Sequence, residues 1–169
     1  VLVNLGLLPG FTRGEMKREV ALIANDCGNF RDQWVYLAGN SASHCVLTCG
    51  IENIELPVRH GEGKFYAEPA VVQQLVDRQQ VILRYAKPGG DVAGGEFPHN
   101  PNGSVLDIAG ICDVTGRVAG MMPHPEAFNH FTNHPDWTLL KERYLRAGKQ
   151  IQEEGDGIRF FRNAVDYFK

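Results

Sequence analysis

The fold is set by residues 107–126, DIAGICDVTGRVAGMMPHPE. Two apolar runs, 107–112 and 117–122, flank the turn-forming residues 113–116, and this arrangement predicts a β-hairpin. Elsewhere the pattern of apolar residues indicates strands at 20–24, 33–37, 54–58 and 81–85, and helices at 69–78, 136–152 and 158–168. Strands interspersed with helices predict an α/β domain.

The hairpin leads directly into Pro123-His124-Pro125-Glu126. In an extended segment residues two apart point to the same side, so His124 and Glu126 are expected to meet. A carboxylate beside an imidazole fixes its tautomer and stabilises the imidazolium, as in a catalytic triad. Pro125 stiffens the backbone between them. By spacing alone, a loop histidine beside a solvated carboxylate is the commoner case.

A second copy of this pattern is His134-Pro135-Asp136. No strand leads into it, and a helix is expected to follow. Asp136 is therefore interpreted as a helix cap or a first-turn acid, and His134 is given no catalytic role.

The composition is that of one ordinary globular domain, with 169 residues, 43% of them hydrophobic and 22% charged. A net charge of −3 gives no reason to expect nucleic acid or an anionic membrane as a partner. No apolar run reaches the roughly 18 residues of a membrane span.

Cys27, Cys45, Cys49 and Cys112 are expected to be reduced thiols in a cytoplasmic protein. A metal module using His44, Cys45 and Cys49 is an alternative, but no second ligand pair follows, so we expect no metal.

Three motifs together carry a resemblance to a known family. The hairpin with its Pro-His-Pro-Glu end resembles the end of class I, triad-type glutamine amidotransferases. More narrowly, LPVRHGEGKF at residues 56–65 and NPNGS at 100–104, followed by DIAGI at 107–111, are similar to the glutaminase part of phosphoribosylformylglycinamidine synthase. The resemblance runs from residue 1 to about residue 137. It implies a flavodoxin-like α/β sheet-and-helix domain.

The resemblance also implies an activity. Glutamine would be hydrolysed through a cysteine thioester, with His124 as base and then acid and Glu126 orienting it. The ammonia would pass to a synthetase subunit or domain in purine biosynthesis. ATP and magnesium would bind to that synthetase partner, and no cofactor is expected in this chain.

The nucleophile is expected upstream of this chain. In the family, a Gly-x-Cys-Asn-Gly-x-Gln turn precedes an apolar helix that ends at Leu-Leu-Pro, and residues 1–10 resemble that helix and stop. We therefore expect a buried helix over residues 1–8, and a chain that is the C-terminal portion of a single amidotransferase domain. It would lack the nucleophile strand, expose an apolar face and an open sheet edge, and be inactive by itself.

Cys112 is the tempting internal substitute for that nucleophile. A nucleophile elbow needs a glycine two residues after the cysteine, and here that position is Val114. Cys112 is therefore expected to be a small buried residue on a hairpin strand.

The His-Gly-Glu-Gly stretch supplies a second group of candidates. By the resemblance, His60, Gly61 and Glu62 would contact the substrate or the synthetase. The alternative is a turn whose glycines serve only the backbone. Asn100, Asn102 and Ser104 are either a docking loop or simple turn residues. For the chain as a whole, a non-catalytic docking domain that retains the amidotransferase fold stays open as the alternative.

Overall fold

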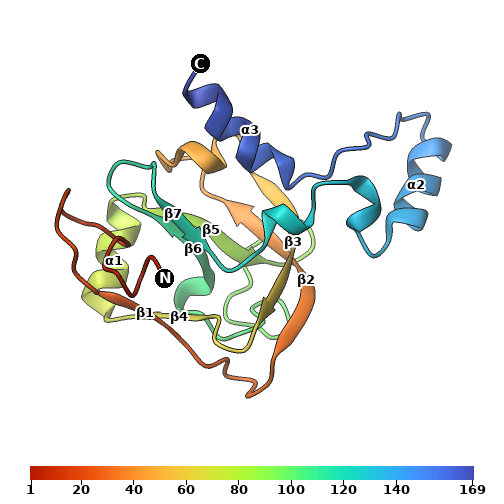
Figure 1. Ribbon diagram of the computed structural model, residues 1–169. Coiled ribbons are helices and arrows are strands. Elements are labelled where there is room, and N and C mark those ends of the chain that lie inside the picture. Colours follow the sequence, from red (N-terminus) through yellow and green to blue (C-terminus); the bar gives the residue numbers. More distant parts are fainter.

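The computed structural model describes residues 1–169 and is built around one five-stranded antiparallel sheet (Figure 1). The spatial order of its strands is β3-β2-β5-β6-β7. Their bounds are β2 Arg31–Gly39, β3 Asn53–His60, β5 Val81–Ala86, β6 Ile108–Cys112 and β7 Ala119–Met121. The predicted hairpin and the strands predicted at 33–37, 54–58 and 81–85 are confirmed.

The β2–β3 pair has two faces with different roles. Trp34 lies opposite Pro57 and Val35 opposite Leu56, so alternate residues point to opposite sides. Val35 and Leu56 are buried in the main core cluster, together with Ile82 and Tyr85 of β5. The other face carries Trp34 and its neighbours, and this outer face supports the candidate site.

The sheet curls so that its two ends meet. Beyond β7, the Met122 amide donates to the Ala109 carbonyl, which continues the pairing with β6 (3.0 Å). Pro123 then forms a bridge with Val58 of β3, and the His124 amide donates to the Pro57 carbonyl (2.8 Å). The two ends of the sheet are therefore joined at this point. We call this meeting of β3 with residues 122–124 the seam.

A smaller sheet and one helix form a second layer. β1 (Val20–Ile23) pairs with β4 (Lys64–Ala67), and α1 (Pro69–Asp77) follows. Phe65 and Leu75 pack with Val81, Ile108 and other apolar residues in a second core cluster. The predictions of a strand at 20–24 and a helix at 69–78 are confirmed, whereas β4 was not predicted.

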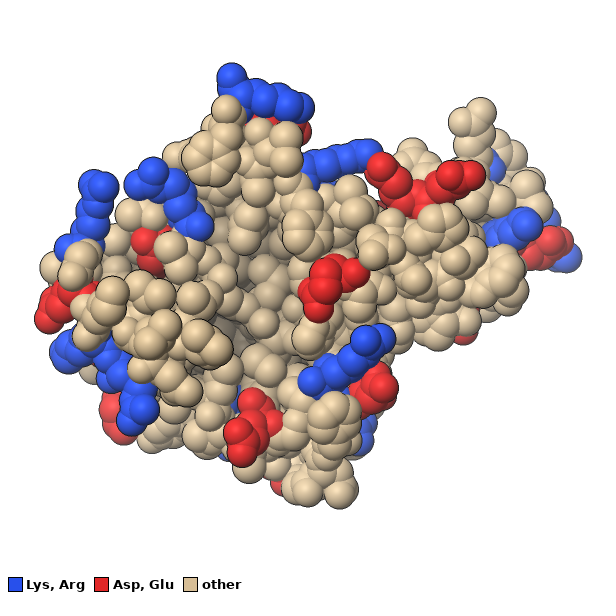
Figure 2. Space-filling view, in the orientation of Figure 1, with Lys and Arg blue, Asp and Glu red and all other residues tan.

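Residues 1–8 do not form the expected buried helix. They make hydrogen-bonded turns, with Val1 and Leu5 exposed. Gly6 has a φ of +72°, and a β-carbon there would lie 2.6 Å from the Lys17 amide nitrogen, so helical backbone stops at this residue. The segment borders an apolar cavity of about 210 Å³ beside β6 and β7. Figure 2 shows the surface of the molecule in the orientation of Figure 1, and the middle of that surface is formed largely by uncharged residues.

The chain ends in two helices with different surroundings. α2 (Trp137–Arg146) has no buried residue and stands away from the rest of the chain (Figure 1). It is shorter than predicted, because Gly148 takes a left-handed φ of +65°. α3 (Ile158–Tyr167), confirmed as predicted, packs against the 3-10 turn Val46–Thr48 and buries Phe160. None of the helices has the length and apolar character that crossing a bilayer would require.

Candidate active site

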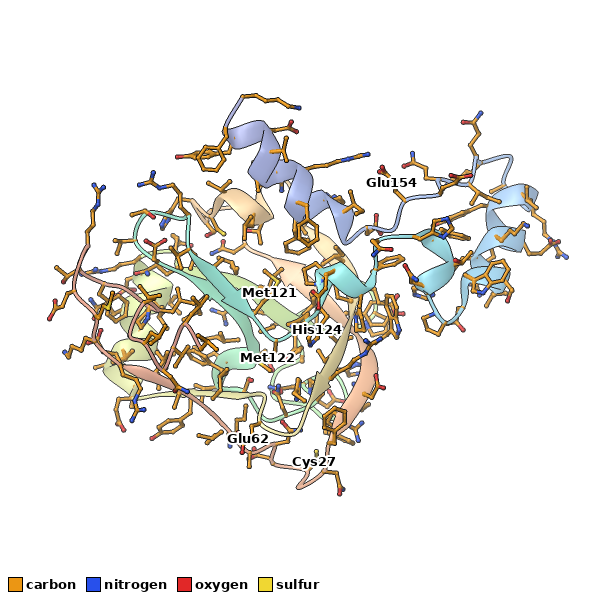
Figure 3. All side chains as sticks on the ribbon, viewed as in Figure 1. Cys27, Glu62, Met121, Met122, His124 and Glu154 are labelled. Carbon is orange, nitrogen blue, oxygen red and sulfur yellow. The ribbon has the colours of Figure 1, made fainter.

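His124 and Glu126 meet at the seam, as predicted. The distance from His124 Nδ1 to Glu126 Oε1 is 2.6 Å. The prediction of an extended backbone is wrong, however, because Glu126 lies in a 3-10 turn, Pro125–Ala127. His124 occupies the N-cap position of this turn without a side-chain capping bond. The imidazole is 36% exposed and the carboxylate 60% exposed, so both are accessible from solvent. In Figure 3 His124 lies close to Met121 and Met122, near the middle of the ribbon.

The contact defines the tautomer of His124. An ionised carboxylate only accepts hydrogen bonds, so Nδ1 carries the proton and donates it to Glu126. The lone pair of Nε2 then points away from Glu126, and no side chain of the protein bonds to it. This is the state of a histidine that is ready to accept a proton at Nε2.

The charge of Glu126 is stabilised by its surroundings. Burial raises the pKa of the Glu126 carboxyl, but the hydrogen bond from His124, a backbone hydrogen bond and nearby positive charge (Arg59, and His124 when its ring is protonated) outweigh burial. The net result is a pKa below the usual value for glutamate. The carboxylate is therefore kept ionised to lower pH than that of a free glutamate.

The start of α3 supports the turn that carries Glu126. The Gly157 amide donates to the Phe128 carbonyl at 2.9 Å. A β-carbon at Gly157 would lie 2.0 Å from the Pro125 carbonyl oxygen, and one at Gly155 would lie 2.5 Å from that of Phe128. Only glycine allows the two backbones to approach this closely. Sequence reasoning missed this support, although Gly155-Asp156-Gly157 before a helix was a visible signal.

The segment that follows the pair covers the outer face of β2–β3. The Trp34 ring packs against Phe128 at 5.0 Å and against His134 at 4.7 Å between ring centroids. His134 Nε2 lies 3.2 Å from Glu55 Oε2, and its Nδ1 accepts the Asp136 amide at 3.0 Å. Asp136 does occupy the N-cap position of α2, but its side chain makes no capping bond. His134 therefore fastens this segment to β3.

His60 lies on the inner face of β3 and is only 5% exposed. Its Nδ1 lies 3.1 Å from Asn25 Oδ1, and its Nε2 lies 3.4 Å from Asn102 Nδ2. Burial lowers the pKa of His60 and outweighs a backbone hydrogen bond that raises it, and the nearby charges of Arg31 and of protonated His124 lower it further. Burial therefore favours the neutral form of the imidazole. Gly61 and Glu62 lie at the surface of the turn that follows.

Of the two glycines in this turn, only Gly63 is required by the packing. A β-carbon at Gly63 would lie 2.3 Å from His60 Nδ1, so the chain can fold back over the ring only at a glycine. Gly61 has no such constraint, since its nearest neighbour would be a Phe30 ring carbon at 3.8 Å.

The Asn100–Ser104 stretch points inward. Asn100, Asn102 and Ser104 are at most 3% exposed. Asn102 donates to the Tyr85 hydroxyl at 3.0 Å and to the Gly63 carbonyl at 2.8 Å. The Ser104 hydroxyl accepts the Phe65 amide at 2.9 Å. These side chains therefore build a buried polar network beneath β3, which fits the turn alternative better than an exposed docking loop.

No hydrogen bond joins a cysteine thiol to His124. Cys112 is fully buried on β6, as predicted, opposite Ala119. Contact with Cys45 and burial raise the pKa of the Cys112 thiol, which keeps it protonated.

The other cysteines lie in three different places. Cys45 is buried in the main core cluster, and Cys49 is exposed beside α3, where its carbonyl accepts Asn163 Nδ2 at 2.8 Å. Cys27 lies near Glu62 at the lower edge of the view (Figure 3), and its thiol faces the carbonyls of Asn29 and Pro101 at 3.5 and 3.8 Å. No group of three or more His, Cys, Asp or Glu side chains converges in a way that could hold a metal ion.

Comparison with known proteins places this geometry in a family. Residues 1–168 match the model of the CobB/CobQ-like glutamine amidotransferase domain. The chain is 42% identical over 171 residues to the phosphoribosylformylglycinamidine synthase subunit PurQ of Methanococcus maripaludis, covering 99% of this chain and 62% of the relative. It is 39% identical over 166 residues to PurQ of Dehalococcoides mccartyi, covering 98% of this chain and 59% of the relative.

A solved structure agrees with the sequence relatives. A chain of the PurLQS structure from Thermotoga maritima matches with a TM-score of 0.63 and 27% identity, over 99% of this chain and 57% of that one. The chain thus spans about three fifths of the length of the proteins it matches. The predicted likeness to glutamine amidotransferases is confirmed over nearly the whole chain: this protein belongs to the CobB/CobQ-like glutamine amidotransferase domain family.

Proposed function

We propose that this chain is part of the glutaminase component of a phosphoribosylformylglycinamidine synthase, which hydrolyses glutamine to supply ammonia for purine biosynthesis. The observation that carries the proposal is the 2.6 Å contact between His124 Nδ1 and Glu126 Oε1, with Nε2 left free. The amidotransferase family and the PurQ relatives give that pair its chemical context.

The reaction we assign to the pair begins with a cysteine thiol whose proton is taken by His124 Nε2. The thiolate attacks the side-chain carbonyl of glutamine, and His124 returns the proton to the departing ammonia, leaving a thioester. His124 then deprotonates a water molecule that hydrolyses the thioester to glutamate. Glu126 holds the ring in the required tautomer throughout and stabilises its charged form.

The cysteine in this proposal lies in a part of the domain outside residues 1–169, and this chain is the C-terminal portion of that domain. The burial of Cys45 and Cys112, which keeps both thiols away from solvent, supports this assignment. Residues 1–169 alone are then expected to release no ammonia from glutamine above the rate of buffer. Ammonia release by the isolated chain would contradict the assignment.

The partner in the proposal is the synthetase subunit or domain that consumes the ammonia, and ATP and magnesium bind there. The structure named PurLQS, which contains a chain similar to this one, supports an assembly of this kind. Gly61 and Glu62 are offered as surface contacts for substrate or partner. His60, being enclosed, would serve such a contact by holding the turn in place.

The test is His124→Ala in the intact glutaminase, assembled with its synthetase. We expect the glutamine-dependent rate to fall by about 10²- to 10⁴-fold, because general acid and base catalysis is lost. Synthesis driven by added ammonium salt should continue. His130→Ala, which removes an exposed histidine from the same segment, is the matched control and should leave both rates near those of the parent.

Two outcomes would overturn the proposal. Equal loss of glutamine- and ammonia-dependent synthesis would mean that His124 serves the structure rather than glutamine hydrolysis. Full glutamine-dependent activity in His124→Ala would favour the alternative of a non-catalytic docking domain.

A further inference from the structure

Gln80 lies in the turn between α1 and β5 and is fully buried, although its side chain is polar. Its Nε2 group donates to two main-chain carbonyls that are far apart in the sequence, that of Pro9 at 2.7 Å and that of Cys112 at 2.8 Å. Both amide hydrogens are then used, and turning the amide over would place Oε1 against two carbonyl oxygens. The orientation of this side chain is therefore fixed, and no chemistry described so far uses it.

The main chain of Gln80 adds to the same junction. Its amide donates to the Leu75 carbonyl at 2.9 Å, and its carbonyl accepts the Cys112 amide at 2.9 Å. Its Oε1 is buried without a hydrogen-bond partner, which is unfavourable. A methionine of similar volume would avoid that cost, but it would leave the Pro9 and Cys112 carbonyls without their donor. What glutamine supplies at this position is thus the link between those two carbonyls.

Residues 1–11, which we call the leading segment, pack along the hairpin of β6 and β7. Leu8 is 1% exposed and belongs to the second core cluster with Ile111. A β-carbon at Gly120 would lie 2.8 Å from Leu8 Cδ1, so the segment lies directly against β7. A second tie comes from Arg78, whose Nη1 donates to the Phe11 carbonyl at 2.8 Å and whose guanidinium carbon lies 5.2 Å from the centre of the Phe11 ring.

The hairpin that Gln80 bonds to is the one that carries the base. Cys112 ends β6, the chain returns through β7, and His124 follows Met122, whose amide continues the pairing with β6. In the proposed function, the cysteine lies in the part of the domain that precedes Val1. Gln80 therefore joins the chain that leads from the cysteine to the chain that leads to His124.

We propose that Gln80 is a positioning residue for glutamine hydrolysis: by bonding to the Pro9 and Cys112 carbonyls it fixes the leading segment against the hairpin, and so sets the distance between the cysteine thiol and His124 Nε2. The inference rests on the glutaminase function proposed above, including the place of the cysteine. Gln80 itself touches neither glutamine nor the reacting atoms. Its effect can still be large, because a displacement of about 1 Å can cost about 10²-fold in rate.

The first experiment measures kcat and KM for glutamine in the intact glutaminase, assembled with its synthetase, for Gln80→Met. This variant keeps the volume of the side chain and removes both bonds. At a temperature where the variant is folded, kcat should fall by about 10- to 10²-fold, because the thiol and the imidazole no longer meet in the productive geometry. KM should change little, and synthesis driven by added ammonium salt should continue at the rate of the parent.

A second measurement separates positioning from stability. A cysteine thiol beside a protonated histidine ionises below the ordinary pKa of about 8.5, so its alkylation by iodoacetamide continues at neutral pH. In Gln80→Met the pH profile of alkylation, followed on the peptide of the nucleophile by mass spectrometry, should move towards that of a free thiol. A loss of stability alone would not move this profile in the folded protein.

Asn40→Leu is the matched control. Asn40 Nδ2 also donates two bonds to the turn that holds Gln80, to Gln79 Oε1 at 3.0 Å and to the Val81 carbonyl at 2.9 Å. Neither bond reaches the leading segment or the hairpin. The variant should therefore keep the kcat and the alkylation profile of the parent, even where it lowers the free energy of unfolding.

Arg78→Met is a second variant, because loss of two buried bonds in Gln80→Met can prevent folding. Arg78 is exposed, and its replacement breaks only the other hydrogen bond to the leading segment. We expect kcat to fall by about 2- to 10-fold, the range of one hydrogen bond, with the alkylation profile moving in the same direction as in Gln80→Met.

The proposal is overturned if folded Gln80→Met keeps the kcat and the alkylation profile of the parent, if it loses ammonia-driven synthesis equally, or if Asn40→Leu reproduces its effects. Where Gln80→Met does not fold, an unchanged kcat and profile in Arg78→Met overturns it. His124→Ala distinguishes these failures from failure of the proposed function. If His124→Ala abolishes glutamine use while Gln80→Met changes nothing, the glutaminase assignment stands and the role of Gln80 falls.

Discussion

Two His-Pro-acid tripeptides lie ten residues apart in this chain, and the fold gives their imidazole rings different hydrogen-bond partners. In His124-Pro125-Glu126, Nδ1 faces the acid of its own tripeptide at 2.6 Å and Nε2 is free. In His134-Pro135-Asp136, Nδ1 accepts the backbone amide of Asp136 at 3.0 Å, and Nε2 faces Glu55 at 3.2 Å. His124 is partly exposed, whereas His134 is 5% exposed.

The difference is one of tautomer. An Nδ1 that accepts an N–H cannot carry a proton, so His134 is protonated at Nε2 and donates to Glu55. Both of its ring nitrogens are then occupied, and it has no lone pair to offer a substrate. The same tripeptide pattern thus leaves Nε2 free in one place and occupies both ring nitrogens in the other, because Nδ1 has a carboxylate partner in the first and a backbone amide partner in the second.

The largest expected effect is on kcat, when the acid of the first tripeptide is replaced by its amide. The same replacement in the second tripeptide serves as the comparison. Glu126→Gln can present its NH₂ group to Nδ1 and so allow the wrong tautomer, and we expect kcat for glutamine to fall by about 10²- to 10⁴-fold. Asp136→Asn, the matched change, should leave kcat within about twofold, because its side chain makes no capping bond. Steady-state assays of ammonia release compare the two. Similar losses in both would remove the distinction between the tripeptides.

The next effect concerns the support of the first tripeptide by α3. Gly157→Ala would place a β-carbon 2.0 Å from the Pro125 carbonyl oxygen, so one of the two backbones must move. We expect a loss of about 1–3 kcal/mol in the free energy of unfolding, together with lower glutaminase activity. Gly61→Ala is the control, since its β-carbon would meet nothing closer than 3.8 Å. Equal stability of the two variants in urea would contradict the close approach.

The sequence predicted the local elements well, because their signals are local. The hairpin follows from two apolar runs around a turn, and α1 from one apolar face behind Pro69. The pairing of His124 with Glu126 was also predicted, although it arises from a 3-10 turn rather than from the expected extended backbone.

What could not be predicted depends on contacts between distant parts of the chain. The seam joins Val58 to Pro123, and Gly157 meets Pro125, and no spacing along the sequence encodes either contact. The burial of His60 was missed for the same reason, because Asn25 and Asn102 enclose it from two other segments. The helix expected over residues 1–8 failed because Gly6 adopts a left-handed φ that apolar patterning does not reveal.

A smaller effect is expected from the second tripeptide. His134→Ala removes the bond to Glu55 and the ring packed on Trp34, and should lower the free energy of unfolding by about 1–3 kcal/mol. At temperatures where the variant is folded, kcat for glutamine should stay close to that of the parent. Thermal unfolding and ammonia release measure the two effects separately. A drop in kcat comparable with that of His124→Ala would show that His134 takes part in the reaction.

The smallest effect is on the pH dependence of the free energy of unfolding and concerns His60. This third histidine neither pairs with Glu126 nor holds the outer segment to β3. Burial lowers its pKa from the ordinary value of 6.5 and outweighs a backbone hydrogen bond that raises it, and the charges of Arg31 and of protonated His124 lower it further. As pH falls through about 6.5, the unfolded chain takes up a proton before the folded protein does, so this contribution to stability is present above that pH and is lost below it.

His60→Gln retains hydrogen-bonding capacity toward Asn25 and Asn102 but has no proton to gain. Urea unfolding from about pH 7.5 to about pH 5, the range that brackets the titration of an unfolded histidine, should show a steeper loss of stability in the parent than in this variant. The variant itself should be less stable at neutral pH, because the amide does not reproduce the shape of the ring. Parallel pH curves for the two proteins would mean that His60 does not titrate on unfolding, and the enclosure of its ring by Asn25 and Asn102 would then not control its charge.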